Sequence, residues 1–341
     1  MKVLVTANTV PYMRGGAEYH IQGLIQQLKN RGHEVETIRF PFWFSPDQDI
    51  LNLMAHCRGL NFGQPNGIRI DKLISLQFPA YGVQHHDHRV WVMHQHRSVY
   101  ELYKPELATQ KQKEFRQKVI DFDNQVLGNI PKRFANSKRV AQRLQQFNHL
   151  SSTPLYHPPF GFERFYNEDD QAYIFYPSRL ESLKRQDLLI KAARYITSPV
   201  KILLAGDGGQ KQTFMELVNQ YQLHDKVRFL GRITESEKLA FYANALAVFF
   251  APFDEDYGYI TLEAMLSAKP VITCTDSGGP LEFVNHNESG YVLEPEPEII
   301  AAAIDELYYN RTRAQEMGQY GLESYQKKNI SWENVVNQLL E

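Results

Sequence analysis

The sequence predicts two α/β domains, each built on a parallel β-sheet covered by helices. A single core accounts for about 150 residues, and the chain has 341. Short apolar runs alternate with amphipathic stretches in two successive sets, which is the order of βαβ units. The hydrophobic share of 43% and the charged share of 22% fit a globular chain and exclude a disordered one.

The first domain is expected to begin on the apolar strand at residues 2–7. Gly15 and Gly16 follow, and an amphipathic helix then carries apolar residues at helical spacing from Ile21 to Leu28. Gly32 fits the end of this helix. The other segments expected in this domain are strands at 34–40, 73–78, 91–93 and 134–136, and a helix at 138–147.

The second domain is expected to begin after a linker near Pro158, Pro159 and Gly161. This linker gives a first domain over residues 1–160 and a second over 161–324. Val, Ile and Phe dominate the short strands of the second domain, and helical patterns lie between them. Its expected strands are 173–178, 200–206, 226–231, 246–252 and 269–274, and its expected helices include 187–195, 235–245 and one that begins near Tyr259.

The charges are distributed unevenly along the chain. The net charge of −2 excludes a generally basic nucleic-acid binder. Residues 1–160 hold 20 Lys and Arg against 12 Asp and Glu, a charge of +8, and residues 161–341 hold 17 against 27, a charge of −10. This asymmetry favours an N-terminal half that faces an anionic partner or a membrane surface, and drift of the surface charge is the alternative.

An aromatic run at residues 40–45 lies outside any clean periodicity. Packing in a buried loop and contact with an acceptor or a membrane are both compatible with it. Cys57 and Cys274 cannot make a disulfide framework or a zinc finger, no apolar run approaches the length of a membrane span, and Met1–Val5 resembles a first strand rather than a signal peptide. These features predict a cytoplasmic protein.

Ligands of open α/β sheets bind at the carboxyl ends of the strands. In the first domain, Gly15 and Gly16 would let backbone N–H groups approach a phosphate or a sugar, although a tight turn explains them equally well. His94 follows the strand at 91–93. The histidines from His85 to His96 suggest a metal, but no HExxH or Cys/His spacing accompanies them, so no metal site is predicted.

In the second domain, Arg179 and Lys184 follow the strand at 173–178, where two cations could neutralise a diphosphate. Glu255 and Glu263 flank Gly258 after the strand at 246–252. The helix that begins near Tyr259 would aim the N–H groups of its first turn at a phosphate. Favourable interaction of Glu263 with the helix dipole is the structural alternative.

The run from Pro252 to Val292 resembles the donor-site signature of family 4 retaining glycosyltransferases, which have the GT-B fold. The segments at 178–192, 203–209 and 227–234 are similar to that family in order and spacing, and those at 135–144 and 157–160 resemble the end of its N-terminal domain. The chain departs from the family's common pattern at Tyr257, where Phe is frequent, and at Arg185, where Gly often follows the lysine.

The resemblance implies two Rossmann-like domains that face each other across a cleft, the first for the acceptor and the second for a nucleotide-sugar. It also implies that a final helix, about 325–341, packs back on the first domain. The implied reaction moves a sugar from a nucleoside-diphosphate sugar to a saccharide or lipid-linked acceptor with retention of configuration. Cell-envelope polysaccharide or lipopolysaccharide synthesis is the expected setting, at the inner face of the cell membrane.

The same resemblance assigns roles to individual residues. Arg179 and Lys184 would hold the diphosphate, and Glu255 and His94 would contact the donor sugar. Glu263 would bind the ribose hydroxyls. The other expected donor contacts are Gly15, Gly16, Gly258, the backbone of Tyr259, Ile260 and Thr261, and Arg232 beside the base.

Two other functions remain open from the sequence. A nucleotide-sugar 2-epimerase shares the two-domain fold, and a non-catalytic protein could bind a sugar nucleotide on it. The two glutamates and the Arg179–Lys184 pair favour transfer. No cofactor or metal is expected, because the two cations would do the work of Mg²⁺, and no nucleic-acid partner is expected.

Overall fold

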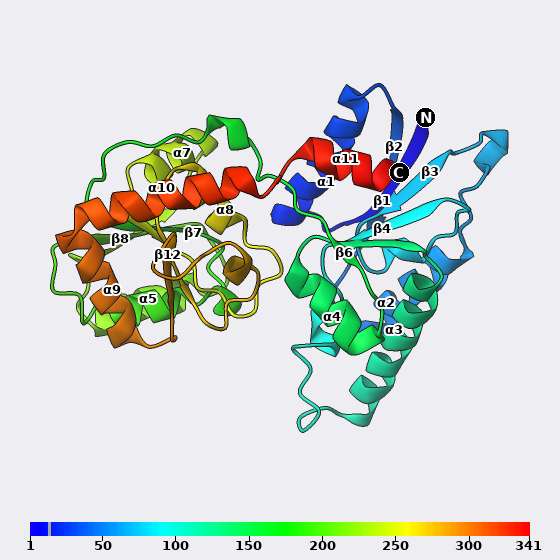
Figure 1. Ribbon diagram of the computed structural model, residues 1–341. Helices are drawn as coiled ribbons and strands as arrows, with labels where there is room; N and C mark the ends of the chain where they lie inside the picture. The colour runs from blue at the N-terminus through cyan, green and yellow to red at the C-terminus, as the bar shows by residue number, and fades with distance from the viewer. Residues whose placement is uncertain (13–14) are drawn as a thin grey trace. The chain divides into compact units, whose positions relative to one another are not determined.

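The computed structural model describes residues 1–12 and 15–341, which form two six-stranded parallel sheets with flanking helices (Figure 1). The sheets have the strand orders β2-β1-β3-β4-β5-β6 and β12-β11-β10-β7-β8-β9. Two Rossmann-like α/β units are therefore confirmed. The strands of the first sheet are β1 (Lys2–Thr9), β2 (Glu34–Pro41), β3 (Lys72–Ser75), β4 (His88–Val92), β5 (Lys132–Ala135) and β6 (Thr153–Pro154).

The second sheet has strands of three to five residues. Helices of seven to ten residues lie between the successive strands from β7 to β11, and two longer helices follow β12. Its strands are β7 (Tyr173–Pro177), β8 (Lys201–Ala205), β9 (Val227–Gly231), β10 (Ala247–Phe249), β11 (Val271–Cys274) and β12 (Gly290–Leu293). Its helices are α5 (Gln186–Ala192), α6 (Lys211–Gln220), α7 (Glu235–Ala243), α8 (Tyr259–Leu266), α9 (Pro297–Tyr309) and α10 (Arg311–Lys327).

The chain divides into two compact units, and the first contains residues from both ends of the described chain. The first unit comprises Met1–His157 and Ser331–Glu341, and the second comprises Pro158–Ile330. The predicted boundary at 324/325 cuts α10, which continues to Lys327 and packs on α8 within the second unit. The helices of the first unit are α1 (Gly16–Asn30), α2 (Asp47–Gly59), α3 (Gln110–Gly128), α4 (Lys138–Asn148) and α11 (Trp332–Leu340).

Successive side chains of a strand point to opposite faces of the sheet. In both sheets, helices cover the two faces and bury the side chains on each. In the first unit, Val3 and Val5 pack with α1 and α11, whereas Leu4 packs with Cys57 of α2. In the second unit, α5 and α9 cover one face of the sheet and α7 and α8 the other (Figure 1). This burial explains the near-continuous apolar runs of the strands.

Helix α11 completes the core of the first unit beside α1. Its Val335, Val336 and Leu339 are buried against the first sheet. At Gly23 of α1, a Cβ atom would overlap the ring of Trp332, so only glycine leaves room for that ring. The Lys72 ammonium also donates a hydrogen bond to the Leu340 carbonyl oxygen at 2.6 Å.

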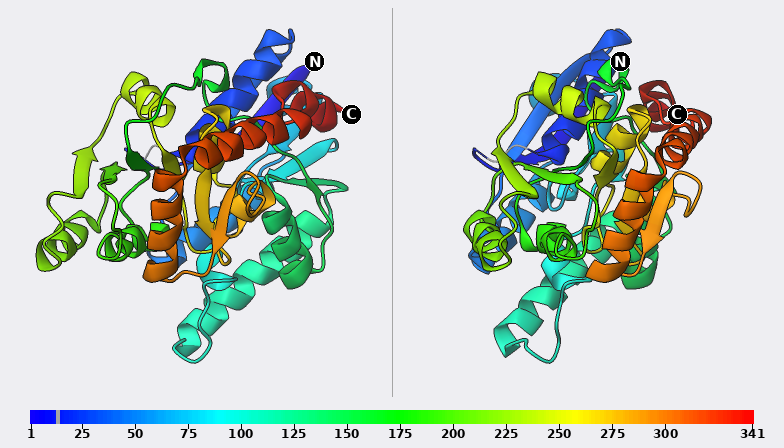
Figure 2. Two further views of the ribbon diagram at one scale, coloured as in Figure 1. Left: turned by 60° about the vertical axis from the view of Figure 1, so that its left-hand side comes forward. Right: turned by 90° about the vertical axis from the view of Figure 1, so that its left-hand side faces the viewer.

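Several elements differ from their predicted ranges. Strand β3 is assigned only as far as Ser75, although the Leu76 N–H still donates to the Thr6 carbonyl of β1 at 3.1 Å and the Leu76 carbonyl accepts from the Met93 N–H at 3.2 Å. Strand β4 begins at His88, where the polar residues His88 and Arg89 are buried among polar partners and hide the apolar pattern. The long helix α3 was not predicted. Figure 2 shows its N-terminal half extending beyond the body of the first unit.

The aromatic run at 40–45 divides between the core and the surface. Phe40 and Phe42 are buried, whereas Trp43 and Phe44 are 54% and 59% exposed. Core packing is therefore confirmed for Phe40 and Phe42, and contact of the exposed residues Trp43 and Phe44 with an acceptor or a membrane stays a prediction. Among the helices of the described residues, none is long and apolar enough to cross a membrane.

We expect Gly23→Val to destabilise the protein by about 1–3 kcal/mol, because the new side chain must displace the Trp332 ring from a packed position. Thermal unfolding of this variant measures the effect. Gln26→Val is the matched control, since it adds the same branched side chain at an exposed position of the same helix. Equal melting temperatures for the two variants would show that close packing of Trp332 on Gly23 does not hold α11 against α1.

Candidate functional site

The strand order places the candidate residues around one edge of each sheet. In the second sheet, β7 and β10 are neighbours, and the chain proceeds outward from β7 to β9 on one side and from β10 to β12 on the other. This reversal is the topological switch point, where open α/β sheets bind ligands at the carboxyl ends of their strands. Lys184 follows β7 and Glu255 follows β10, so both lie at that point.

Lys184 and Glu255 are directly paired across the switch point. The Lys184 ammonium donates a hydrogen bond to Glu255 Oε2 at 2.5 Å, and the two side chains are 17% and 21% exposed. The ammonium also lies 5.6 Å from the centre of the Phe250 ring. The sequence predicted the two residues separately, one for a diphosphate and one for a sugar, and the structure brings their charges together.

Arg179 and Arg232 lie at the same edge of the sheet in different surroundings. The Arg179 side chain is exposed and has no hydrogen-bond or ion-pair partner among the described residues, so its charge is open to a ligand. Arg232 follows the edge strand β9, is 86% exposed, and lies 3.6 Å from an Asp207 carboxylate oxygen. This exposed ion pair with Asp207 holds the Arg232 side chain only weakly.

Helix α8 follows Gly258, whose backbone conformation favours glycine. Gly258 has a φ of 84°, in the left-handed region, and a Cβ there would lie 3.1 Å from the Pro280 ring. The N–H of Thr261 donates to the Gly258 carbonyl at 3.1 Å, so this N–H is already engaged, contrary to the expectation that it faces a phosphate. The Ile260 N–H has no acceptor among the described groups and remains suitable for one.

Glu263 is held inside α8 by two side chains of α7. The Tyr242 hydroxyl donates to Glu263 Oε2 at 2.6 Å, and the Lys238 ammonium donates to Oε1 at 3.1 Å. The Glu263 side chain is only 10% exposed. A carboxylate oxygen accepts more than one hydrogen bond, so Glu263 retains acceptor capacity toward a ligand while its position is fixed.

Burial and charge act together on the α7 side chains. Burial alone would lower the pKa of Lys238, but the carboxylates of Glu263 and Glu235 hold its pKa above the usual value. Burial, reinforced by Glu263, also raises the pKa of Tyr242. Lys238 is thus a cation and Tyr242 a hydroxyl donor at neutral pH, and both donate hydrogen bonds to Glu263.

In the first unit, Gly15 and Gly16 form the start of α1, directly after β1. Glu18 of the first turn binds Arg39 of β2 through two hydrogen bonds, at 2.8 and 3.1 Å. The Arg39 Nε also donates to the Asn8 carbonyl at 2.8 Å. A Cβ atom at Gly15 would meet no atom of the described residues within 4 Å, so the described part of the chain leaves the backbone there open to close approach.

His94 follows β4 at the same edge of the first sheet. Its Nδ1–H donates to the carbonyl of Gln95 at 2.9 Å, which leaves Nε2 as the acceptor of the neutral ring. Behind it, Gln95 binds Asn148, Asn148 binds Tyr100, and the Tyr100 hydroxyl donates to the buried Asp123 at 2.6 Å. This chain of hydrogen bonds fixes the loop that carries His94.

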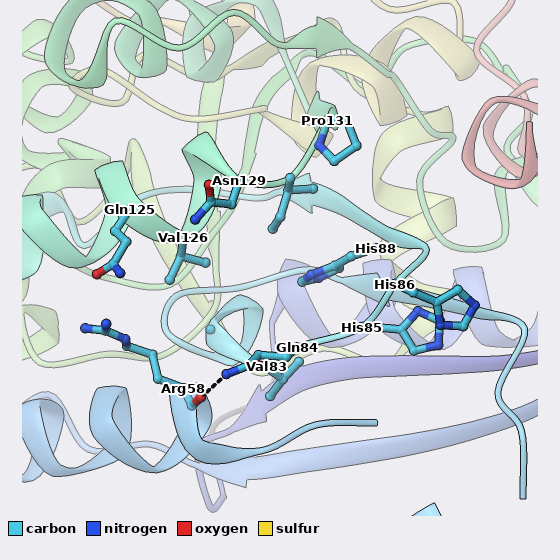
Figure 3. A pocket seen from close by; sticks show the side chains of 12 residues that line it. Arg58, Val83, Gln84, His85, His86, His88, Gln125, Val126, Asn129 and Pro131 are labelled. Atoms are coloured by element: carbon cyan, nitrogen blue, oxygen red, sulfur yellow. Dashed lines mark hydrogen bonds between the residues drawn. The ribbon is translucent and has the colours of Figure 1, made fainter. Parts of the chain in front are cut away.

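The other histidines of the run lie elsewhere and are mostly engaged. Figure 3 shows His85, His86 and His88 around a pocket of about 350 Å³ at the amino ends of β4 and β5, the end opposite to His94. Both ring nitrogens of His85 bind backbone atoms, and burial lowers the pKa of His88 to about 3. No group of three or more metal-ligating side chains occurs in the part of the chain that the structure describes.

Sequence reasoning missed four residues that shape the site. Lys238 and Tyr242 hold Glu263, and Arg185 binds Asp276. Lys238 and Tyr242 are four residues apart on one helix face, which was the available signal, but nothing in the sequence shows that this face meets Glu263. The pairing of Arg185 with Asp276 joins residues 91 positions apart and has no local signature.

Comparison with known proteins finds similarity over part of the chain. Residues 162–324 match the family model of glycosyl transferases group 1. The chain is 32% identical over 110 residues to human alpha-1,3/1,6-mannosyltransferase ALG2, covering 32% of this chain and 26% of that protein. It is 34% identical over 158 residues to the GDP-mannose-dependent alpha-(1-6)-phosphatidylinositol monomannoside mannosyltransferase of Mycobacterium tuberculosis, covering 43% and 40%. The chain thus spans less than half the length of these curated relatives.

Solved structures match nearly the whole chain. Sucrose-phosphate synthase from Thermosynechococcus elongatus matches with a TM-score of 0.79 and 17% identity, over 98% of this chain and 97% of that one. HepE of Anabaena, solved in complex with UDP and glucose, matches with a TM-score of 0.71 and 17% identity, over 100% and 98%. These similarities confirm the GT-B fold class.

Proposed function

Residues 162–324, which lie within the second unit, match the family model of glycosyl transferases group 1, and on that premise we propose that the chain is a glycosyltransferase. It moves a sugar from a nucleoside-diphosphate sugar to a saccharide or lipid-linked acceptor. The first unit supplies the acceptor contacts and the second unit binds the donor. Relatives named as mannosyltransferases and a neighbour solved with UDP and glucose support this reaction class.

The pairing of Lys184 with Glu255 at the switch point is the observation that carries the proposal. Transfer from a nucleoside-diphosphate sugar separates charge, because the diphosphate leaves as an anion while the sugar ring becomes cationic. A cation and a carboxylate fixed side by side match both charges of that transition state. Arg179, with its unpaired guanidinium, adds a second cation for the diphosphate.

The remaining site residues take supporting roles in this proposal. Glu263 binds the ribose hydroxyls, and the Ile260 N–H at the start of α8 adds to the diphosphate contacts. His94 accepts from the donor sugar through Nε2, and Gly15 and Gly16 allow close backbone approach. Arg232 flanks the base. Transfer proceeds with retention of configuration, as the sequence resemblance implies, and the two cations make a metal ion unnecessary.

The first test is a thermal-shift screen with UDP, GDP, ADP and their sugar conjugates, each with and without EDTA. A bound nucleotide raises the melting temperature by mass action, so one nucleotide is expected to stabilise the protein, with or without the chelator. Turnover with that nucleotide-sugar is then measured by product analysis. Free nucleoside diphosphate formed only when an acceptor is present is the expected result.

Other outcomes separate the competing functions. An epimer formed from the nucleotide-sugar alone would identify a 2-epimerase, and binding without any turnover would identify a non-catalytic binding protein. Stabilisation that EDTA abolishes and Mg²⁺ restores would contradict metal-independent binding. No stabilisation by any of the three nucleotides would contradict the proposed function itself.

Glu255 and Glu263 should differ in their kinetic effects. Glu255→Gln removes the carboxylate that faces the developing sugar cation, so kcat should fall by about tenfold or more. Glu263→Gln removes an interaction that does not change during reaction, so it should mainly raise the donor KM. Steady-state kinetics of both variants, with thermal unfolding as the control for folding, measure the split.

Nucleotide binding by the Glu255→Gln variant tests the ion pair between Lys184 and Glu255 without measuring turnover. In the parent, Lys184 must leave or share its carboxylate partner when a diphosphate binds. We therefore expect the free nucleoside diphosphate to bind Glu255→Gln at least as tightly as the parent. A larger loss of kcat in Glu263→Gln than in Glu255→Gln would show that the two roles are assigned wrongly.

We also propose that the protein is cytoplasmic and acts at the inner face of the cell membrane in envelope polysaccharide or lipopolysaccharide synthesis. The +8 charge of residues 1–160 supports the membrane contact, because a basic residue near an anionic surface contributes about 1 kcal/mol. Lys111, Lys113 and Lys118 lie exposed on the projecting half of α3 (Figure 2). Trp43 and Phe44 lie exposed elsewhere on the unit, with no Lys or Arg between Phe40 and Cys57.

Co-sedimentation with vesicles tests the membrane contact. Binding is expected to vesicles that contain anionic lipid, to weaken at raised salt, and to fall in a variant with Lys111, Lys113 and Lys118 changed to Gln. Trp43→Ser with Phe44→Ser is the companion variant, which shows whether the aromatic pair takes part. Equal, negligible sedimentation with anionic and neutral vesicles would instead favour a soluble acceptor.

A further inference from the structure

Arg185 occupies a backbone position that favours glycine. It follows the short 3₁₀ turn Ser182–Lys184 and precedes α5, with a φ of 54° and a ψ of 40° in the left-handed region. That conformation is strained for a residue that carries a Cβ atom. The glycosyltransferases that the sequence resembles often carry glycine at this position, so this chain keeps the backbone shape and adds a long cationic side chain.

The Arg185 side chain binds two loops that are distant in sequence. Its two terminal nitrogens donate to the two carboxylate oxygens of Asp276 at 2.7 and 2.8 Å. Its Nε donates to the Ala251 carbonyl at 2.8 Å, and a terminal nitrogen donates to the Pro252 carbonyl at 3.1 Å. The paired contact uses the planar fork of arginine, which lysine lacks.

Backbone hydrogen bonds join the same three loops around this guanidinium. The Phe253 N–H donates to the Leu183 carbonyl at 2.8 Å, which links the loop after β10 to the loop after β7. The Glu255 N–H donates to the Ser277 carbonyl at 2.9 Å, which links the loop after β10 to the loop after β11. The Arg185 side chain adds hydrogen bonds from the loop after β7 to the loop after β10 and to the loop after β11. Arg185 is also the residue directly after Lys184 in the sequence.

We propose that Arg185 is a positioning residue that, with Asp276, sets the spacing between Lys184 and Glu255 for transfer. This inference rests on the proposed function. Arg185 follows Lys184 directly, and its guanidinium binds the carbonyls of Ala251 and Pro252, just before Glu255. It therefore fixes the cation that meets the diphosphate relative to the carboxylate that meets the sugar.

Catalysis needs this spacing more than binding does. A diphosphate bound by Lys184 and Arg179 tolerates a small shift of the Glu255 loop, because the phosphate contacts follow the cations. The transition state does not tolerate it, because misplacing a charge by a small distance removes stabilisation that only the transition state receives. Loss of the Arg185 contacts should thus lower kcat while leaving the donor KM nearly unchanged.

Arg185→Gly is the central variant, because glycine accepts the left-handed backbone without strain. We expect kcat to fall by about tenfold or more, with the donor KM within about threefold of the parent. Arg185→Lys should not rescue kcat, since an ammonium cannot make the paired contact with Asp276. Asp276→Asn should lower kcat in the same direction, and the double variant should be no worse than Arg185→Gly, because both changes remove one interaction.

Hydrogen–deuterium exchange of the free protein gives a readout that needs no substrate. In Arg185→Gly, faster exchange is expected in residues 250–258 and 275–279, and unchanged exchange in α6, which does not contact Arg185. Gln222→Gly is the matched control: Gln222 is exposed, has a φ of 55°, and makes no side-chain contact with these loops. It should change neither kcat nor exchange in these loops.

Two results would overturn the inference. One is an Arg185→Gly variant with kcat within about twofold of the parent, and the other is unchanged exchange in both loops. A parallel rise in KM and loss of nucleotide binding would assign Arg185 to donor binding instead. A parent protein that binds none of UDP, GDP and ADP would contradict the proposed function, and the exchange data would still decide whether Arg185 orders the loops.

Discussion

The ion pair between Lys184 and Glu255 depends on the neighbouring positions of β7 and β10 in the second sheet. The two residues are 71 positions apart, and their charges meet because parallel pairing of these strands ends both at one edge. Further hydrogen bonds hold the backbone of both residues in place. The Tyr176 hydroxyl donates to the Lys184 carbonyl, and the Glu255 N–H donates to the Ser277 carbonyl. A partly buried pair keeps a strong mutual attraction, so a ligand that enters must offer each member a comparable partner. A nucleoside-diphosphate sugar offers both.

Glu263 illustrates a second way to place a carboxylate. It lies one helical turn beyond the glycine that starts α8, and Lys238 and Tyr242 occupy both of its oxygens. An isolated carboxylate at this depth would be costly, and the ammonium and the hydroxyl offset that cost. Because Glu263 is fixed before any ligand arrives, its hydrogen bonds to a ligand lose little side-chain entropy. Glu255, by contrast, is held by one long lysine side chain and is suited to respond to changing charge.

Much of the fold and part of the site could be predicted from the sequence. Apolar strands that are buried on both faces have strong local patterns, so β1, β7 and β8 were found within about two residues. The residues at the carboxyl ends, Arg179, Lys184, Glu255 and Glu263, followed from the strand order and the family resemblance. Contacts between loops could not be found in this way, because Arg185 and Asp276 have no common spacing or period. Strand β4 was shortened in prediction because its buried His88 and Arg89 look like surface residues until their partners are known.

Because α11 belongs to the first unit, the second unit is an insertion within it. The chain leaves the first unit after His157 and returns to it at Ser331. During synthesis, residues 158–330 therefore emerge complete and can fold as one continuous segment, whereas the first unit must wait for Trp332, Val335 and Leu339 to fill its core. Until then, the face of α1 around Gly23 stays uncovered and apolar. The first unit, although it begins the sequence, is thus the later of the two to have all of its residues synthesised.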